Sequence, residues 1–70
     1  MSLGEAIREH RKRAGYTQAD LADMLGFSQP SLSRVECGVQ DVDTHTLKRI
    51  EDLLKLRRGT LYQFDLAAAA

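Results

Sequence analysis

The sequence predicts an all-α fold made of five short helices in one small domain. Apolar residues recur at steps of three and four along most of the chain, and the two-residue alternation of a half-buried strand is missing. Three boundaries also repeat one pattern: an apolar residue, a good N-cap residue, and an apolar residue four places after the cap. With 70 residues, we expect a single domain over residues 3–66.

The first two helices are predicted over Leu3–Ala14 and Gln18–Leu25. Gly15 ends the first, because glycine tolerates the left-handed conformation that often follows a helix. Thr17 is the predicted N-cap of the second, and Asp20 three residues later completes a capping box.

The third helix is predicted over Gln29–Cys37, after the three-residue link Gly26-Phe27-Ser28. So short a link sets two helices at a steep crossing, the helix-turn-helix arrangement. With Ser28 as N-cap, Pro30 is the second helical residue, where its missing N–H breaks no intrahelical bond.

The fourth helix is predicted over Thr44–Lys55, capped by Asp43, and a short fifth over Gly59–Phe64. The closing alanines, residues 67–70, follow no amphipathic pattern. We interpret them as an unstructured tail, either native or left from an expression vector.

The third helix presents two different faces. A rotation of about 100° per residue puts Leu32 and Val35 on a core side. The outward side is polar and poor in acids, and it carries Gln29, Pro30, Ser33, Arg34 and Cys37. Arginine and glutamine are residue types that read guanine and adenine edges in the major groove. Ser28 and Ser31 add small hydroxyls near free N–H groups that can meet phosphate. The simpler alternative is an ordinary solvated arginine and a helix-start glutamine.

Composition excludes several classes of function. The lone Cys37 allows no disulfide within the chain, and with His10 and His45 it shows no metal-ligand spacing, so we expect no metal or other cofactor. No apolar run approaches the length of a membrane span, and we expect a cytoplasmic protein. The net charge is zero, so composition alone does not indicate nucleic acid. We expect no enzyme, since there is no glycine-rich phosphate loop, no catalytic constellation and little room for an enclosed pocket.

The stretch YTQADLADMLGFSQPSLSRVECG, Tyr16 to Gly38, closely resembles the helix-turn-helix of the Cro and phage-repressor type, also called the Xre or lambda-repressor-like family. The likeness continues through TLKRIEDLLKL and LYQF and covers about residues 3–64. It implies a compact five-helix domain with the helix-turn-helix at the second and third helices, and double-stranded DNA as the partner.

The resemblance also implies roles for individual residues. Base contacts fall to Gln29, Pro30, Ser33 and Arg34. Phosphate contacts fall to Gln18 at the start of the second helix and to the loop after the third with the start of the fourth, and we expect Thr17, Gln18, Ser28, Ser31 and Thr44 to make them. The residues Arg11 and Glu36 match an ion pair that holds the third helix in place.

That loop is where the chain departs from the family pattern. Similar proteins place Lys or Arg after the glycine matching Gly38, whereas this loop reads VQDVDTHT, with two acids and no Lys or Arg. Phosphate contacts supply much of the affinity for DNA. We therefore expect weaker DNA binding per subunit and more reliance on dimerisation.

The C-terminal segment is predicted to form a homodimer contact. Its apolar side chains exceed what a short fifth helix can bury, and a core this small often needs self-association. Related domains often meet through the fifth helix and the loop before it, so the resemblance implies the interface residues Leu56, Arg57, Arg58, Tyr62 and Phe64. The sequence thus predicts a transcriptional regulator that binds an inverted repeat and blocks or recruits polymerase. The alternative is an antitoxin-like module of the same fold, which binds DNA mainly with a partner protein such as a toxin.

Overall fold

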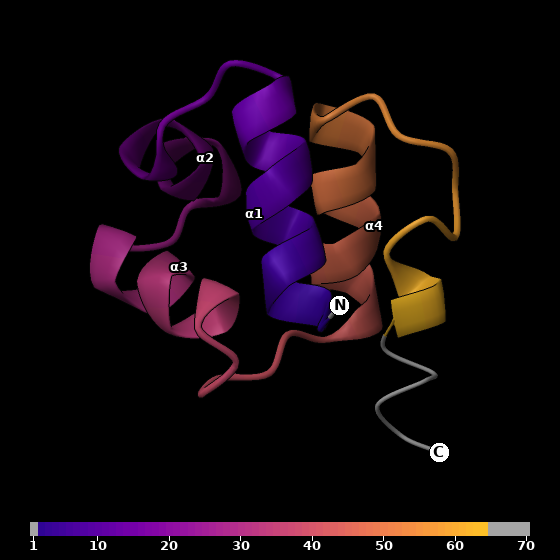
Figure 1. Cartoon of the computed structure of the whole chain (residues 1–70). Coiled ribbons are helices and arrows are strands. Elements are labelled where there is room, and N and C mark those ends of the chain that lie inside the picture. The colour runs from indigo at the N-terminus through magenta and orange to yellow at the C-terminus, as the bar shows by residue number, and fades with distance from the viewer. Residues whose placement is uncertain (1, 65–70) are drawn as a thin grey trace.

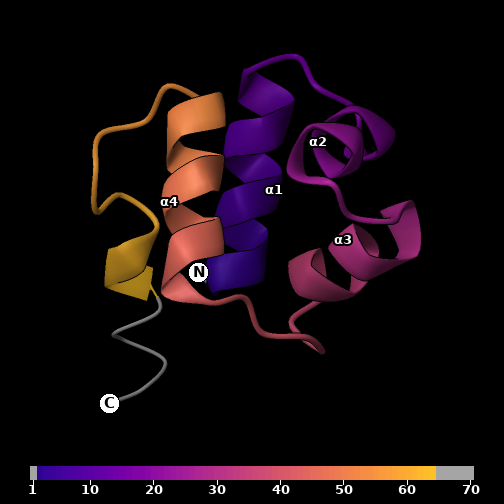
Figure 2. The same ribbon diagram turned by 180° about the vertical axis from the view of Figure 1, so that it is seen from behind.

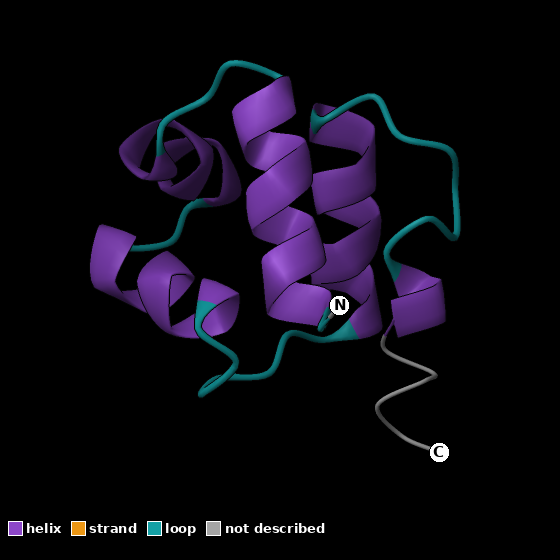
Figure 3. Cartoon of the chain, viewed as in Figure 1, coloured by secondary structure: helices purple, strands orange, loops and turns teal. Residues whose placement is uncertain are grey.

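A computed structural model of the chain describes residues 2–64. It contains four helices joined by short loops, α1 (Leu3–Arg13), α2 (Gln18–Leu25), α3 (Gln29–Glu36) and α4 (Thr44–Leu53), and the described part has no strand (Figure 3). Residues 62–64 are helical as well and correspond to the predicted fifth helix. Residues 65 and 66 of the predicted domain, and the tail 67–70, lie outside the described residues.

The helices pack as α1 beside α4, with α2 and α3 on one side and residues 62–64 on the other (Figures 1 and 2). The axes of α2 and α3 cross steeply after the three-residue link, as predicted. The all-helical, lambda-repressor-like fold class is therefore confirmed. One buried apolar cluster connects the elements, and its members come from every helix and from the C-terminal segment: Ala6, Ile7, Leu21, Ala22, Leu25, Leu32, Val35, Leu47, Ile50, Leu54 and Leu61.

The predicted N-caps are all present. The Thr17 hydroxyl accepts the Asp20 N–H at 3.1 Å, the Ser28 hydroxyl accepts the Ser31 N–H at 3.2 Å, and the Asp43 carboxylate accepts the Thr46 N–H at 2.7 Å. The sequence reading missed one further cap. Ser2 and Glu5 form a capping box that starts α1.

Three helices end slightly earlier than predicted, since α1 stops at Arg13, α3 at Glu36 and α4 at Leu53. In α4 the reason is Lys55, whose φ of 57° is left-handed, so the predicted end at Lys55 was wrong. The predicted fifth helix was wrong at its start. Gly59, with a φ of 94°, lies in a turn, and helix is found only from residue 62.

Gly4 brings α1 directly against the end of α3. A Cβ atom at this position would lie 2.5 Å from the carbonyl oxygens of both Val35 and Glu36. Backbone atoms cannot swing aside as a flexible side chain can, so only glycine permits this approach. The close contact sets the distance between the first helix and the helix predicted to read DNA.

Candidate nucleic-acid interface

The outer face of α3 carries the four residues predicted to contact bases. Gln29, Pro30 and Arg34 are exposed, whereas Ser33 is half-buried. Pro30 lies in the first turn, as predicted, and starts the helix without interrupting it. On the opposite face Leu32 and Val35 are buried in the core. Packing therefore fixes α3 from behind and leaves its polar edge free.

A buried ion pair ties α3 to α1. Arg11 Nε donates to Glu36 Oε2 at 2.8 Å and Arg11 Nη2 donates to Glu36 Oε1 at 3.1 Å, so the pair is bidentate. Arg11 Nη1 also donates to the Tyr16 carbonyl oxygen at 2.9 Å, in the loop before α2. The arginine thereby joins α1, the start of α2 and α3 through one side chain.

Gln18 completes this network from the start of α2. Its Nε2 donates to Glu36 Oε1 at 3.2 Å, which uses one of the two amide hydrogens. The second amide hydrogen stays available for the phosphate contact that the family pattern implies. Together with Ser33, Arg8 and Cys37, the network lines a polar hollow of about 380 Å³ between the three helices.

The remaining hydroxyls predicted to meet phosphate lie at helix starts. Thr17, Ser28 and Thr44 are exposed, and Ser31 is half-buried. The hydroxyl oxygens of Thr17 and Ser28 accept backbone N–H groups as caps. The Ser28 hydroxyl in turn donates its hydrogen to the Ser31 hydroxyl at 3.0 Å.

Two helix starts already hold a negative charge. The Thr17 backbone N–H, and second its hydroxyl, hold the pKa of Asp20 below its usual value. The Thr46 side chain, and second its backbone N–H, likewise lower the pKa of Asp43 at the start of α4. A carboxylate at that helix start repels an approaching phosphate, which agrees with the acidic character of the loop before it.

Arg34 is held by two neighbours that sequence reasoning did not connect to it. Its Nε donates to Gln40 Oε1 at 3.2 Å, and its Nη2 donates to the Ser31 hydroxyl at 3.4 Å. The Ser31 hydroxyl also accepts a hydrogen bond from the Ser28 hydroxyl at 3.0 Å. No sequence signal marked Gln40, because its partner lies six residues away across a turn.

Arg49 is a second cation that the sequence reading missed. Its Nη1 donates to the Leu25 carbonyl oxygen at 3.3 Å and its Nη2 to the Met24 carbonyl oxygen at 3.2 Å. These carbonyls belong to the last turn of α2, where a cation is favourable. Arg49 therefore holds α2 on α4 by capping its C-terminal end.

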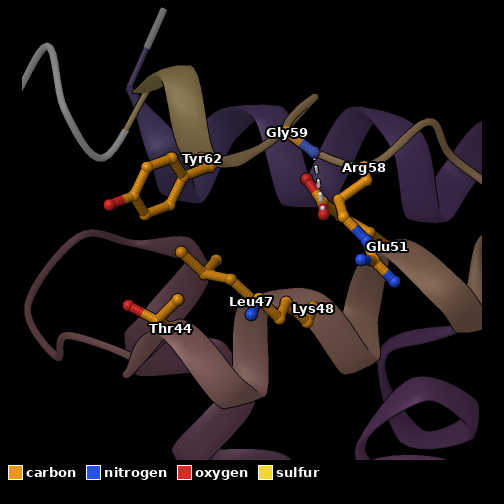
Figure 4. Close-up of a pocket in the computed structure, with 7 residues that line it drawn as sticks. All are labelled: Thr44, Leu47, Lys48, Glu51, Arg58, Gly59 and Tyr62. Atoms are coloured by element: carbon orange, nitrogen blue, oxygen red, sulfur yellow. Dashed lines mark hydrogen bonds between the residues drawn. The ribbon is translucent and has the colours of Figure 1, made fainter.

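Two of the predicted dimer residues, Arg58 and Tyr62, line a second hollow of about 290 Å³, which is also lined by Thr44 of the predicted phosphate contacts (Figure 4). Tyr62, Arg58 and Lys48 line it, with Leu47 at its base. Of the predicted set, Arg57, Arg58 and Tyr62 are exposed, whereas Leu56 and Phe64 are half-buried against the core. The structure thus brings Arg58 and Tyr62 together at this hollow.

Glu51 also lines this hollow, and the sequence did not indicate its role. Its side-chain oxygens accept the Gly59 N–H at 3.1 Å and the Leu61 N–H at 2.8 Å, and the residue is only 3% exposed. The first of these bonds is drawn in Figure 4. A buried carboxylate with two backbone donors fixes the turn at residues 59–61 onto α4.

Two searches of the described residues bear on other kinds of site. None of the helices there has the length and apolar character that a membrane crossing requires. Within residues 2–64, no three potential His, Cys, Asp or Glu ligands gather closely enough to hold a metal ion.

Comparison with known sequences gives a family match and several relatives. A sequence model described as helix-turn-helix matches residues 7–61. The chain is 42% identical over 65 residues to the HTH-type transcriptional regulator ImmR of Bacillus subtilis, covering 93% of this chain and 51% of that protein. It is 34% identical over 69 residues to the SPbeta prophage-derived regulator YonR of the same species, covering 91% of this chain and 64% of that protein. This chain thus spans about half to two thirds of these relatives.

A solved structure shares the fold. It is that of SinR, described as the master regulator for biofilm formation, in complex with DNA. The TM-score is 0.76 at 28% sequence identity, and the match covers 86% of this chain and 97% of the other.

Proposed function

The chain belongs to the helix-turn-helix family of the Cro and phage-repressor type, a family of DNA-binding regulators that are not enzymes, and we propose that it is a sequence-specific transcriptional regulator. The observation that carries this proposal is the polar edge of α3, on which Gln29 and Arg34 are exposed, with the buried Arg11–Glu36 pair behind it. An edge held rigidly from the core side is preorganised for a groove, so little ordering is left for binding.

In the proposed complex α3 enters the major groove of double-stranded DNA. Gln29 and Arg34 meet base edges, Pro30 and Ser33 lie against the groove, and Gln18 donates its free amide hydrogen to a phosphate. Thr17, Ser28, Ser31 and Thr44 offer further hydroxyls to the backbone. The Ser28 hydroxyl would have to release Ser31 to make such a contact, because its hydrogen is donated to the Ser31 hydroxyl at 3.0 Å.

The test is selection of bound sites from random DNA, followed by titrations of the best site and of single-base variants. Arg34→Ala should remove preference at one position per half-site, at a cost of about 1–3 kcal/mol there. Arg13→Ala is the matched control, because Arg13 is an exposed arginine of α1 that lies away from this edge. If Arg34→Ala instead weakened binding equally on every sequence, the base-reading role would be wrong.

We also propose that the regulator acts as a homodimer through the surface around Tyr62. Two α3 helices would then enter successive major grooves about 34 Å apart, and the operator would be an inverted repeat. The support is the aromatic side chain of Tyr62, which is 40% exposed and lines a hollow together with Leu47 and Arg58.

Sedimentation of Tyr62→Asp against the unchanged chain tests the dimer. The variant should be monomeric and bind its operator more weakly with the same base preference. Val39→Asp is the control for sedimentation alone, because Val39 is a large apolar residue of the described part that is 73% exposed and lies outside the proposed interface. A Tyr62→Asp protein that still dimerises would place the interface elsewhere.

A second candidate is a module that binds DNA mainly together with a partner protein. The observation that favours it is the carboxylate of Asp43 at the start of α4, where a phosphate would otherwise approach. A gel shift of the isolated protein at two salt concentrations separates the two. A specific shift alone supports the regulator, whereas a shift that needs a neighbouring gene product supports the module.

A further inference from the structure

We propose that Gln40, in the loop after α3, is a positioning residue that aims the Arg34 guanidinium at a guanine. This inference rests on the proposed function, because it concerns how the reading edge achieves its specificity. The direct observation is the hydrogen bond of 3.2 Å from Arg34 Nε to Gln40 Oε1.

The backbone turn after α3 places Gln40 beside Arg34. Gly38 adopts a φ of 81°, the Gly38 N–H donates to the Val35 carbonyl, and the Val39 N–H donates to the Arg34 carbonyl at 3.0 Å. This pair of bonds is a Schellman motif, which folds the chain back over the end of the helix. The next residue, Gln40, is therefore returned to the level of Arg34 by backbone geometry.

The hydrogen bonds select which edge of the guanidinium stays free. A guanidinium carries one N–H on Nε and two on each terminal nitrogen, in a planar fork. Nε bonds Gln40 and Nη2 bonds the Ser31 hydroxyl, so the side edge of the fork is occupied within the protein. The end edge, made of Nη1 and the second Nη2 hydrogen, remains free. That edge can donate two parallel hydrogen bonds to guanine O6 and N7.

The loop composition fits this role. Gln40 lies in a loop that has no Lys or Arg, and a neutral amide beside Asp41 and Asp43 is a poor phosphate ligand. An amide oxygen is, however, a good acceptor for an arginine Nε. The loop thus contributes to specificity through Arg34, without itself adding a cation.

The test is a double-mutant cycle on the selected operator and on operators altered at the Arg34-dependent base pair. Arg34→Ala should reduce the preference at that pair by roughly 5- to 150-fold. Gln40→Ala should reduce the same preference by about two- to tenfold, the range for one hydrogen bond, and leave binding to unrelated DNA unchanged. In the Arg34→Ala background, Gln40→Ala should have no further effect on it. Val39→Ala, a truncation of the exposed neighbour, is the control and should change neither quantity.

Two results would overturn the inference. If Gln40→Ala weakened binding to all DNA, and did so equally without Arg34, Gln40 would be a direct phosphate ligand. If Gln40→Ala strengthened specific binding, the contact would restrain Arg34 from reading DNA.

A measurement without DNA separates this inference from the proposed function. In a ¹⁵N–¹H spectrum, the Arg34 Nε–H signal should shift and exchange faster with water in Gln40→Ala, but not in Val39→Ala. An unchanged signal overturns the inference whatever the DNA result. Failure of the unchanged chain to select any DNA sequence counts against the proposed function alone.

Discussion

Replacing Arg11 by methionine should severely destabilise the domain. Methionine keeps an apolar stem in the same space but removes all three donated hydrogen bonds, two to Glu36 and one to the Tyr16 carbonyl oxygen. The Glu36 side chain is only 3% exposed, so its carboxylate would keep Gln18 as its one donor and lose its positive partner.

The magnitude follows from that burial. Removing one partner of a buried ion pair typically costs about 3–5 kcal/mol, because the remaining charge is left uncompensated. At roughly 0.05–0.15 kcal/mol per residue, a 70-residue domain has a free energy of unfolding of about 3.5–10 kcal/mol. The Arg11→Met domain should therefore lose roughly a third or more of its free energy of unfolding, and its Tm should fall by at least ~12 °C.

Urea unfolding followed by circular dichroism provides the assay, with Arg13→Met as control. Arg13 is exposed in the same helix, so its replacement should change the free energy of unfolding by less than about 0.5 kcal/mol. The double variant Arg11→Met, Glu36→Met removes both charges and should be more stable than the sum of the single effects implies. A loss below about 1 kcal/mol for Arg11→Met, or strict additivity in the double variant, would refute the reasoning.

Three other perturbations test separate parts of the structure. Gly4→Ala should lower the free energy of unfolding, measured by urea titration, by about 1–3 kcal/mol, because the added Cβ would overlap backbone oxygens of α3. This loss should exceed the gain from the better helix propensity of alanine. An unchanged urea midpoint would mean that α1 can move away from α3 without cost. Glu51→Gln should leave one of two buried backbone N–H groups without an acceptor, at a cost of about 1–3 kcal/mol, and hydrogen exchange at Leu61 should accelerate; continued protection there would contradict this role. The pKa of Asp20 is lowered in the folded state, so its contribution to stability is present above the usual carboxyl pKa and is lost as the pH falls through the lowered value. Asp20→Asn should therefore flatten part of the acid limb of stability against pH, and an identical acid limb would exclude that contribution.

Two of the arginines that contribute to the zero net charge make contacts within the domain. Arg11 pairs with Glu36, and Arg49 donates to the last carbonyl groups of α2. The charge of Arg11 is thus paired within the domain, whereas Arg49 is exposed and keeps its charge, because its partners are neutral carbonyl groups. Asp43 caps α4 close to the proposed phosphate contacts. With a net charge of zero, the proposed regulator is expected to rely on base contacts of α3 more than on long-range attraction.

The sequence by itself determined where the four longer helices begin. Each capping side chain and the backbone N–H that it accepts lie three residues apart, and each apolar stripe repeats within one helix, so these local signals can be recognised without knowledge of the fold. The polar edge of α3 could be predicted for the same reason. The ends of the helices were harder to predict, because the left-handed turn at Lys55 lacks the glycine that usually marks such a turn.

The tertiary structure alone decided the contacts that join distant parts of the chain. Three such contacts depend on how closely distant segments approach one another. They are the packing of Gly4 against the end of α3, the hydrogen bonds of Glu51 to the 59–61 turn, and those of Arg49 to the end of α2. Such approaches arise from the packing of the whole core and leave no periodic signal in the sequence. The orientation of Arg34 belongs to the same class, since the sequence shows its guanidinium, and only the turn that returns Gln40 to it determines which edge is free.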